Sequence, residues 1–191
     1  AMLAYETAYL KANYQAEFMA ALLTSIMDDT DKVALYWEEC RRMGLSVLPP
    51  DVNFSEVNFS VDQGQIRFGL AAIKNAGRAA MENIIEVREE GGLFQSLADL
   101  CQRVDLRIIT KRTLESMVKA GATGSLNGNR AQQLAILDKV VEEAQAYQRQ
   151  QLGGQGLLWD SLPSSVVQTP LPNLPEVAAE TRLAWEKETV G

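Results

Sequence analysis

The sequence predicts a mainly α-helical fold with a small β-hairpin, and three observations support this. Apolar residues recur at helical spacing in most of the chain, and glycines and helix-capping residues separate these stretches. Residues 45–70 break the pattern with two adjacent prolines and two short β-like runs. Of the 191 residues, 47% are hydrophobic and 23% are charged, which is typical of a globular protein with a core.

Residues 1–44 are predicted to form helices. An apolar stripe at helical spacing predicts one long helix, or two with a bend, from Leu3 to about Met27; it comprises Leu3, Tyr5, Tyr9, Leu10, Tyr14, Phe18, Ala21 and Leu22. A further helix follows, with Asp29 or Thr30 as its N-cap and Gly44 at its end. We interpret the acids Asp28, Asp29 and Asp31 as capping residues rather than a metal site. The first residues are typical of the middle of a helix, so we expect a fragment of a longer protein.

The next segments follow from prolines, glycines and capping residues. In residues 45–70 we expect an extended segment and then a hairpin of Phe59–Val61 and Ile66–Phe68. Residues 71–150 should form short helices, one of them capped by Ser96: about Ala71–Lys74, Arg78–Glu89, Leu97–Arg103, Lys111–Lys119 and Arg130–Gln150. Residues 151–175 have linker composition, and residues 176–191 can form a last short helix.

The inventory of reactive side chains weighs against catalysis. The chain contains no histidine, which removes the commonest general base and the commonest zinc ligand. Cys40 and Cys101 are far apart in sequence, and neither belongs to a Cys-x-x-Cys pair. We expect two reduced thiols in a cytosolic protein, and no catalytic residue or metal ligand in this chain.

Charge is distributed unevenly along the chain. The net charge is −7, which on its own argues against nucleic acid as a partner. Residues 66–130, however, contain ten Lys or Arg against seven Asp or Glu, so this stretch is mildly basic at +3 between acidic ends.

Within the basic stretch, Lys74-Asn75-Ala76-Gly77-Arg78 is typical of the turn of a helix-hairpin-helix element. Gly77 would allow a very tight turn, and the following helix would present unpaired N–H groups to one phosphate. Lys74 and Arg78 would supply the positive charge. Four apolar residues would pack the two helices together: Ile73, Met81, Ile84 and Ile85. Such an element grips the DNA backbone without reading its sequence.

A second, looser candidate turn lies between Lys119 and Arg130, beginning at Gly121. Lys111 and Arg112 could add further phosphate contacts. The spacing of either turn alone is also compatible with a glycine corner in a plain helical bundle. Two such elements, both in the basic stretch, favour DNA binding.

Four ordered motifs resemble one known family: YETAYLKANYQAEFMAALLTS, EECRRMGLSVLPPDVNFS, IRFGLAAIKNAG and KRTLESMVKAGA. They are similar to the alpha subunits of bacterial DNA polymerase III, the C-family replicases. The resemblance covers essentially the whole chain, from the end of the fingers through the tandem helix-hairpin-helix region to the start of a connection toward an oligonucleotide-binding domain. It implies contact with duplex primer-template DNA and with the rest of the polymerase. It also implies a two-metal, magnesium-dependent palm outside this stretch, so the chain alone should be inactive and hold no cofactor.

The same resemblance implies a sliding-clamp motif in the linker. The family pattern begins with Gln and ends in two bulky apolar residues, and Gln155-Gly156-Leu157-Leu158-Trp159 fits it, with Trp159 where phenylalanine is more usual. Large apolar anchors on a short peptide are a common means of filling a preformed pocket. The alternatives are that Leu157, Leu158 and Trp159 pack back onto a helix, that the chain is a helix-hairpin-helix module of a repair or recombination protein, or that it is a structural helical adaptor.

Overall fold

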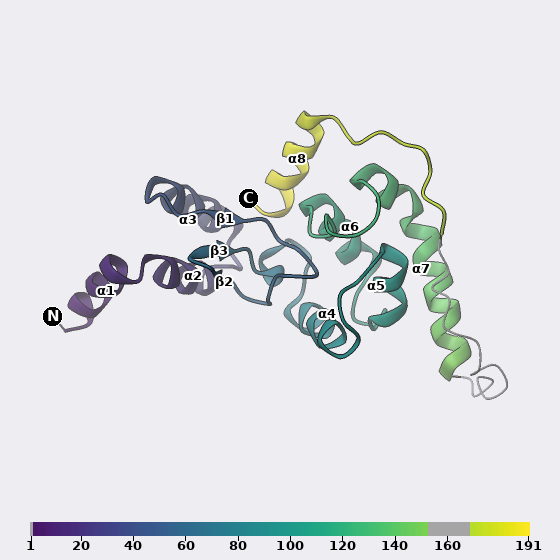
Figure 1. The fold of residues 1–191 in the computed structure, drawn as a ribbon, viewed down its shortest axis with the longest axis horizontal. Helices are drawn as coiled ribbons and strands as arrows, with labels where there is room; N and C mark the ends of the chain where they lie inside the picture. Colours follow the sequence, from purple (N-terminus) through teal and green to yellow (C-terminus); the bar gives the residue numbers. More distant parts are fainter. Residues whose placement is uncertain (1, 153–168) are drawn as a thin grey trace.

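The computed structural model describes residues 2–152 and 169–191 (Figure 1). The described residues confirm a mainly α-helical fold with a small sheet. Eight α-helices are present in them: α1 (Met2–Asn13), α2 (Gln15–Ser25), α3 (Thr30–Arg42), α4 (Arg78–Gly91), α5 (Leu97–Arg103), α6 (Lys111–Ala120), α7 (Arg130–Leu152) and α8 (Ala179–Thr189). None of these helices is both long and apolar enough to cross a membrane.

The N-terminal stretch forms two helices with a break at Tyr14. The backbone of Tyr14 leaves the helical region, with φ −132° and ψ 58°, and α1 projects away from the rest of the molecule (Figure 1). The prediction of two helices with a bend is confirmed, but the apolar stripe is exposed where it lies on α1, at Tyr5, Tyr9 and Leu10. The residues of α2 that enter the core lie on another face: Ala16, Met19, Ala20 and Leu23.

Helix α3 begins and ends as the sequence predicts. The carboxylate of Asp29 accepts the backbone N–H of Lys32 and pairs with its ammonium at 2.9 Å, so Asp29 caps α3. These contacts lower the pKa of Asp29 below its usual range. Gly44 follows the helix with φ 76°, in the left-handed region that glycine favours.

The predicted hairpin is present and belongs to a three-stranded sheet. Strands β2 (Ser60–Asp62) and β3 (Gln65–Arg67) pair antiparallel around Gln63 and Gly64, which both have positive φ, as type I′ turns require. The extended segment contains an additional strand, β1 (Val47–Leu48), parallel to β3, so the order is β1-β3-β2. Two residues give too short a run for the sequence pattern to reveal.

The segment from Asp51 to Glu56 connects several parts of the molecule through buried polar groups. The amide of Asn53, 7% exposed, donates to the carbonyl of Phe94 and to Oγ of Ser125, both at 3.0 Å, and accepts the N–H of Phe94 at 2.8 Å. Val52 donates its N–H to the carbonyl of Ala122 at 2.8 Å. One loop thereby fixes the α4–α5 connection and the α6–α7 turn together.

Helix α4 is attached to the same segment by a buried arginine. The guanidinium of Arg88 donates to the carbonyls of Val52 and Ser55, at 3.2 and 2.7 Å, and pairs with Glu56 at 3.1 Å. On the other side of the molecule, residues 169–178 run back from the α7 side to α8, which lies against α6 (Figure 1).

Replacing Asn53 by alanine should destabilise the fold strongly. The change removes three hydrogen bonds and leaves the buried N–H and carbonyl of Phe94 without partners, so we expect a loss of about 3 kcal/mol in the free energy of unfolding. Urea denaturation measures it. Asn173→Ala, at an exposed position, is the matched control and should change stability little; equal effects of the two changes would contradict the role of Asn53.

Stability should also fall at high pH because of a buried thiol. Burial raises the pKa of Cys101 to about 12, against about 8.5 for a thiol in an unfolded chain. The native state therefore retains a proton that the unfolded state loses, and stability should fall above about pH 8.5 by up to about 1.4 kcal/mol per pH unit. Urea unfolding at several pH values in this range measures the effect. In Cys101→Ala, the free energy of unfolding should fall less steeply with pH. A native Cys101 that reacts readily with a thiol reagent at neutral pH would contradict this.

Candidate nucleic-acid interface

The first hairpin joins a short helical turn to the N-terminus of α4. The predicted helix Ala71–Lys74 is a single 3₁₀ turn, η1 (Leu70–Ala72). The left-handed residue is Asn75, with φ 65°, whereas Gly77 has φ −63°, so the prediction that Gly77 makes the turn tight was wrong. The four apolar residues that were predicted to pack the hairpin are all buried: Ile73, Met81, Ile84 and Ile85.

Helix α6 holds the unusual backbone conformation at Asn75. The side-chain amide of Asn75 donates to Oγ of Ser116 at 2.9 Å, and the backbone carbonyl of Asn75 accepts the hydroxyl of Thr113 at 3.1 Å. Asparagine tolerates the left-handed region better than most residues. The turn is thus braced by α6 and opens on the N-terminus of α4.

At that N-terminus, several backbone donors of exposed residues are unpaired within the described part of the chain. Among the described residues, no acceptor bonds the N–H groups of Gly77, Arg78 or Ala79, which the first turn of a helix leaves unpaired. A Cβ built at Gly77 meets nothing within 4 Å, whereas one at Gly69 would lie 2.5 Å from the backbone of Asn58. Packing within the described chain therefore explains a glycine at 69 but not at 77.

Two cationic residues, Lys74 and Arg78, belong to this hairpin, and a third, Arg112, lies on the helix that braces it. Arg78 is half exposed, donates to Oδ1 of Asn58 at 2.9 Å and lies 3.9 Å from Glu82. Arg112 is exposed next to Thr113 on α6, and no ion pair forms on it within the described residues. Asn58 is a residue that sequence reasoning missed, because it lies twenty positions from Arg78.

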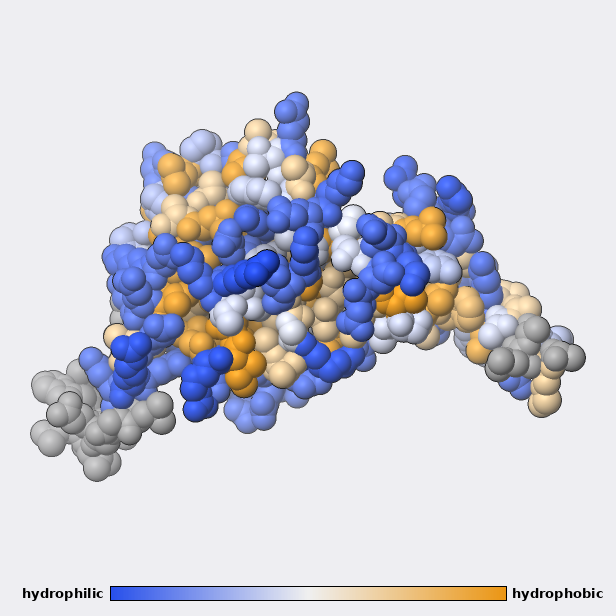
Figure 2. Space-filling model, turned by 180° about the vertical axis from the view of Figure 1, so that it is seen from behind, coloured by the Kyte–Doolittle hydropathy of each residue, from blue (hydrophilic) through white to orange (hydrophobic). Residues whose placement is uncertain are grey.

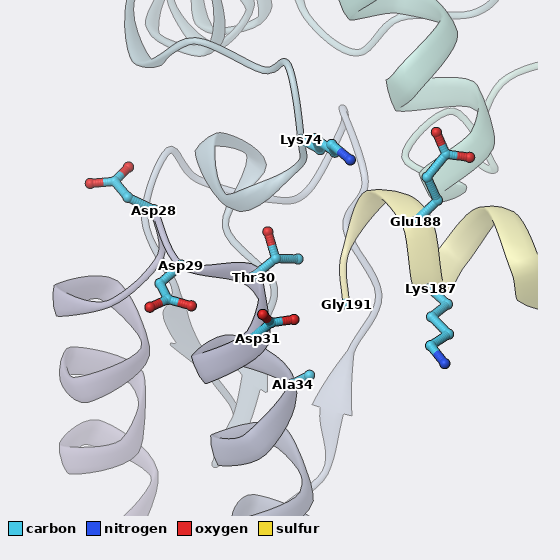
Figure 3. Close-up of a pocket in the computed structure, with 9 residues that line it drawn as sticks. All are labelled: Asp28, Asp29, Thr30, Asp31, Ala34, Lys74, Lys187, Glu188 and Gly191. Carbon is cyan, nitrogen blue, oxygen red and sulfur yellow. The ribbon is translucent and has the colours of Figure 1, made fainter.

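The exposed Lys74 borders a pocket of about 590 Å³ between the start of α3, the loop that follows η1 and the C-terminal end of α8 with Gly191 after it (Figure 3). Its backbone N–H donates to the carbonyl of Thr189 at 2.9 Å, so the chain position is fixed. Four acidic residues and one further lysine line the same pocket, namely Asp28, Asp29, Asp31, Glu188 and Lys187. The backbone of Lys74 is thus fixed, while its ammonium is exposed and has no ion-pair partner among the described residues.

The second hairpin has a conventional helix end and start. Gly121 follows α6 with φ 83°, and Asn129 caps α7 by accepting the N–H of Gln132 at 2.9 Å, while Gln132 Oε1 accepts the N–H of Asn129. This reciprocal pair was present in the sequence as Asn-x-x-Gln, a relative of the capping box, and was missed.

The cations of the second hairpin are bonded within the chain. Arg130 donates to the carbonyl of Lys119 at 3.1 Å and pairs with Glu186 at 2.6 Å. Lys119 pairs with Glu115 at 2.8 Å. Lys111, at the start of α6, pairs with Asp138, and this hydrogen bond raises the pKa of Lys111.

The predicted clamp-binding motif and the question of a metal site remain. Gln155, Leu157, Leu158 and Trp159 lie outside the described residues. In the described part of the chain, no three or more His, Cys, Asp and Glu side chains are grouped so as to hold a metal ion. Figure 2 shows apolar and polar side chains interspersed on the face opposite to that of Figure 1.

Comparison with known proteins agrees with this geometry. Residues 44–133, which contain the first hairpin and the second up to the start of α7, match the model of the helix-hairpin-helix motif. The chain is 42% identical to DNA polymerase III subunit alpha of Vibrio cholerae and 44% identical to that of Thermus aquaticus. Both matches cover 100% of this chain but only 17% and 15% of these relatives. Over its whole length the chain is therefore similar to one segment of the bacterial DNA polymerase III alpha subunits, and residues 44–133 within it carry the helix-hairpin-helix motif.

Proposed function

We propose that this chain holds duplex primer-template DNA for a bacterial replicative polymerase, without reading base sequence, and tethers that polymerase to its sliding clamp. The observation that carries the DNA-binding part is the open N-terminus of α4. Three N–H groups there have no acceptor among the described residues, and the space where a Cβ of Gly77 would lie is open. A phosphate oxygen in that space would satisfy the donors and benefit from the helix dipole.

Charge supports the same site. Lys74 and Arg78 belong to the hairpin itself, and Arg112 stands on the helix that braces it. These side chains and the N–H groups contact only phosphate in this proposal, so all duplex sequences should bind alike. Only a few phosphates are neutralised, so affinity should fall gently with salt concentration.

The chemistry of nucleotide addition is not part of this proposal. The relatives are polymerase subunits of which this chain spans a small part, and two-metal transfer needs a set of closely spaced carboxylates. We expect this chain to bind and position the duplex. The magnesium-dependent step would be performed elsewhere in the polymerase.

Reversing charge at the first hairpin should weaken duplex binding. We expect Lys74→Glu with Arg78→Glu to lower affinity at least about tenfold for every sequence tested and to flatten the salt dependence. Fluorescence anisotropy with a labelled duplex measures both. Lys139→Glu with Arg149→Glu makes the same charge change on the outer face of α7 and should have a much smaller effect. If both double variants lost the same amount of duplex affinity, binding would depend on the overall charge of the chain and not on the first hairpin.

The tether is proposed from sequence. Gln155 would hydrogen-bond at the mouth of the clamp pocket, and Leu158 and Trp159 would fill its apolar floor, with Leu157 beside them. Few contacts in a short peptide give modest affinity, because ordering the peptide costs free energy. Joining the peptide to a DNA-binding module raises its effective concentration on the same primer-template.

Calorimetric titration of the chain with the cognate clamp tests the tether. We expect saturable binding that Leu158→Ala with Trp159→Ala abolishes, because the anchors would be lost. Val166→Ala with Val167→Ala trims apolar side chains of the same segment outside the motif and should preserve binding. A well-folded chain that does not bind the clamp would leave DNA holding as its function.

A further inference from the structure

The second hairpin is covered by the C-terminal part of the chain. The side chain of Leu171 lies so close to Gly128 that a Cβ there would be 2.9 Å from Cδ1 of Leu171. The amide of Asn129 donates to the carbonyl of Leu174 at 3.0 Å, and that of Gln132 donates to the carbonyl of Pro172 at 2.9 Å. The start of α7 thus has polypeptide, rather than open space, in front of it.

Two carboxylates occupy the positions where an anion would bind. Oε2 of Glu176 accepts the backbone N–H of Arg130 at 3.4 Å, at the first residue of α7. Oε1 of Glu186 pairs with the guanidinium of the same Arg130 at 2.6 Å. An anion at a helix N-terminus and an anion on the flanking arginine are the two contacts that a DNA phosphate would make there.

The other cation of this hairpin is covered as well. The ammonium of Lys119 lies 5.8 Å from the centroid of the Trp185 ring, on α8, and 2.8 Å from Glu115. Only 23% of the Lys119 side chain is exposed, and only 18% of that of Arg130. At the first hairpin, by contrast, 49% of the Arg78 side chain is exposed and no described carboxylate accepts from the N–H groups.

We propose that the second hairpin is the docking site of the C-terminal segment, residues 171–189, whose Glu176 and Glu186 stand in for DNA phosphates. Duplex DNA is then held through the first hairpin alone. This inference rests on the proposed DNA binding, because it states which of the two hairpins performs it. A duplex could use the second hairpin only by displacing both carboxylates and the side chains packed around them.

Neutralising the two acids should open the second hairpin. In Glu176→Gln with Glu186→Gln, duplex affinity should rise and the salt dependence should steepen by about 0.9 in log–log slope, corresponding to one added phosphate contact. Glu89→Gln with Glu90→Gln removes the same charge from exposed positions at the end of α4 and controls for net charge. Identical affinity and slope in the two double variants would overturn the inference.

A second variant tests the docking by hydrogen exchange as well as by duplex affinity. Arg130→Gln should leave duplex affinity close to that of the unaltered chain, while hydrogen exchange of the α8 amides becomes faster and that of α4 stays unchanged. Unchanged α8 exchange, or a loss of duplex affinity as large as that from reversing Lys74 and Arg78, would overturn the inference.

The two proposals fail in different ways. If neither the unaltered chain nor any variant binds duplex, both the proposed function and the assignment of DNA binding to the first hairpin are wrong, whatever the exchange rates of the α8 amides. If duplex binds and Arg130 is required, the function stands and the assignment to the first hairpin falls. Binding that appears only after Glu176 and Glu186 are neutralised would support the docking and overturn the proposal that the first hairpin suffices.

Discussion

The buried amide of Asn53 is the contact on which the arrangement of the two hairpins depends. It bonds both backbone groups of Phe94 and the hydroxyl of Ser125, while neighbouring Val52 bonds the carbonyl of Ala122. Because Arg88 ties α4 to the same loop, one short segment fixes the helix that follows the first hairpin and the turn of the second. Buried polar groups that are fully satisfied in this way specify one geometry, since every alternative leaves donors or acceptors unpaired.

This frame presents two hairpins of similar design with different surroundings. The first opens on solvent, with exposed cations and unpaired N–H groups. The second has its helix start and its arginine bonded by residues 172–186. The difference arises from long-range contacts of the C-terminal segment rather than from the hairpin sequences. It divides the region into one surface suited to an external anion and one that holds the chain's own acids.

Local chemistry explains what the sequence could predict. Capping by Asp29 and Ser96, the Gln63-Gly64 hairpin turn and the buried face of α4 each depend on residues close together in the chain. The failures arise where distant residues decide. Asn75, rather than Gly77, adopts positive φ because Thr113 and Ser116 of α6 bond it. The aromatic residues of α1 have helical spacing, yet the break at Tyr14 directs them to solvent. No local pattern could place Glu176 or Glu186 on Arg130, some fifty positions away.

The most direct test of the account is to follow backbone amides during titration with a short duplex. In ¹H–¹⁵N correlation spectra at low ionic strength, the account predicts that Gly77, Arg78 and Ala79 shift most, because their N–H groups gain phosphate acceptors. Amides at the start of α7 and along α8 should stay close to their original positions. The account would be contradicted if the amides at the start of α4 did not move, or if the largest shifts appeared at Arg130 and its neighbours.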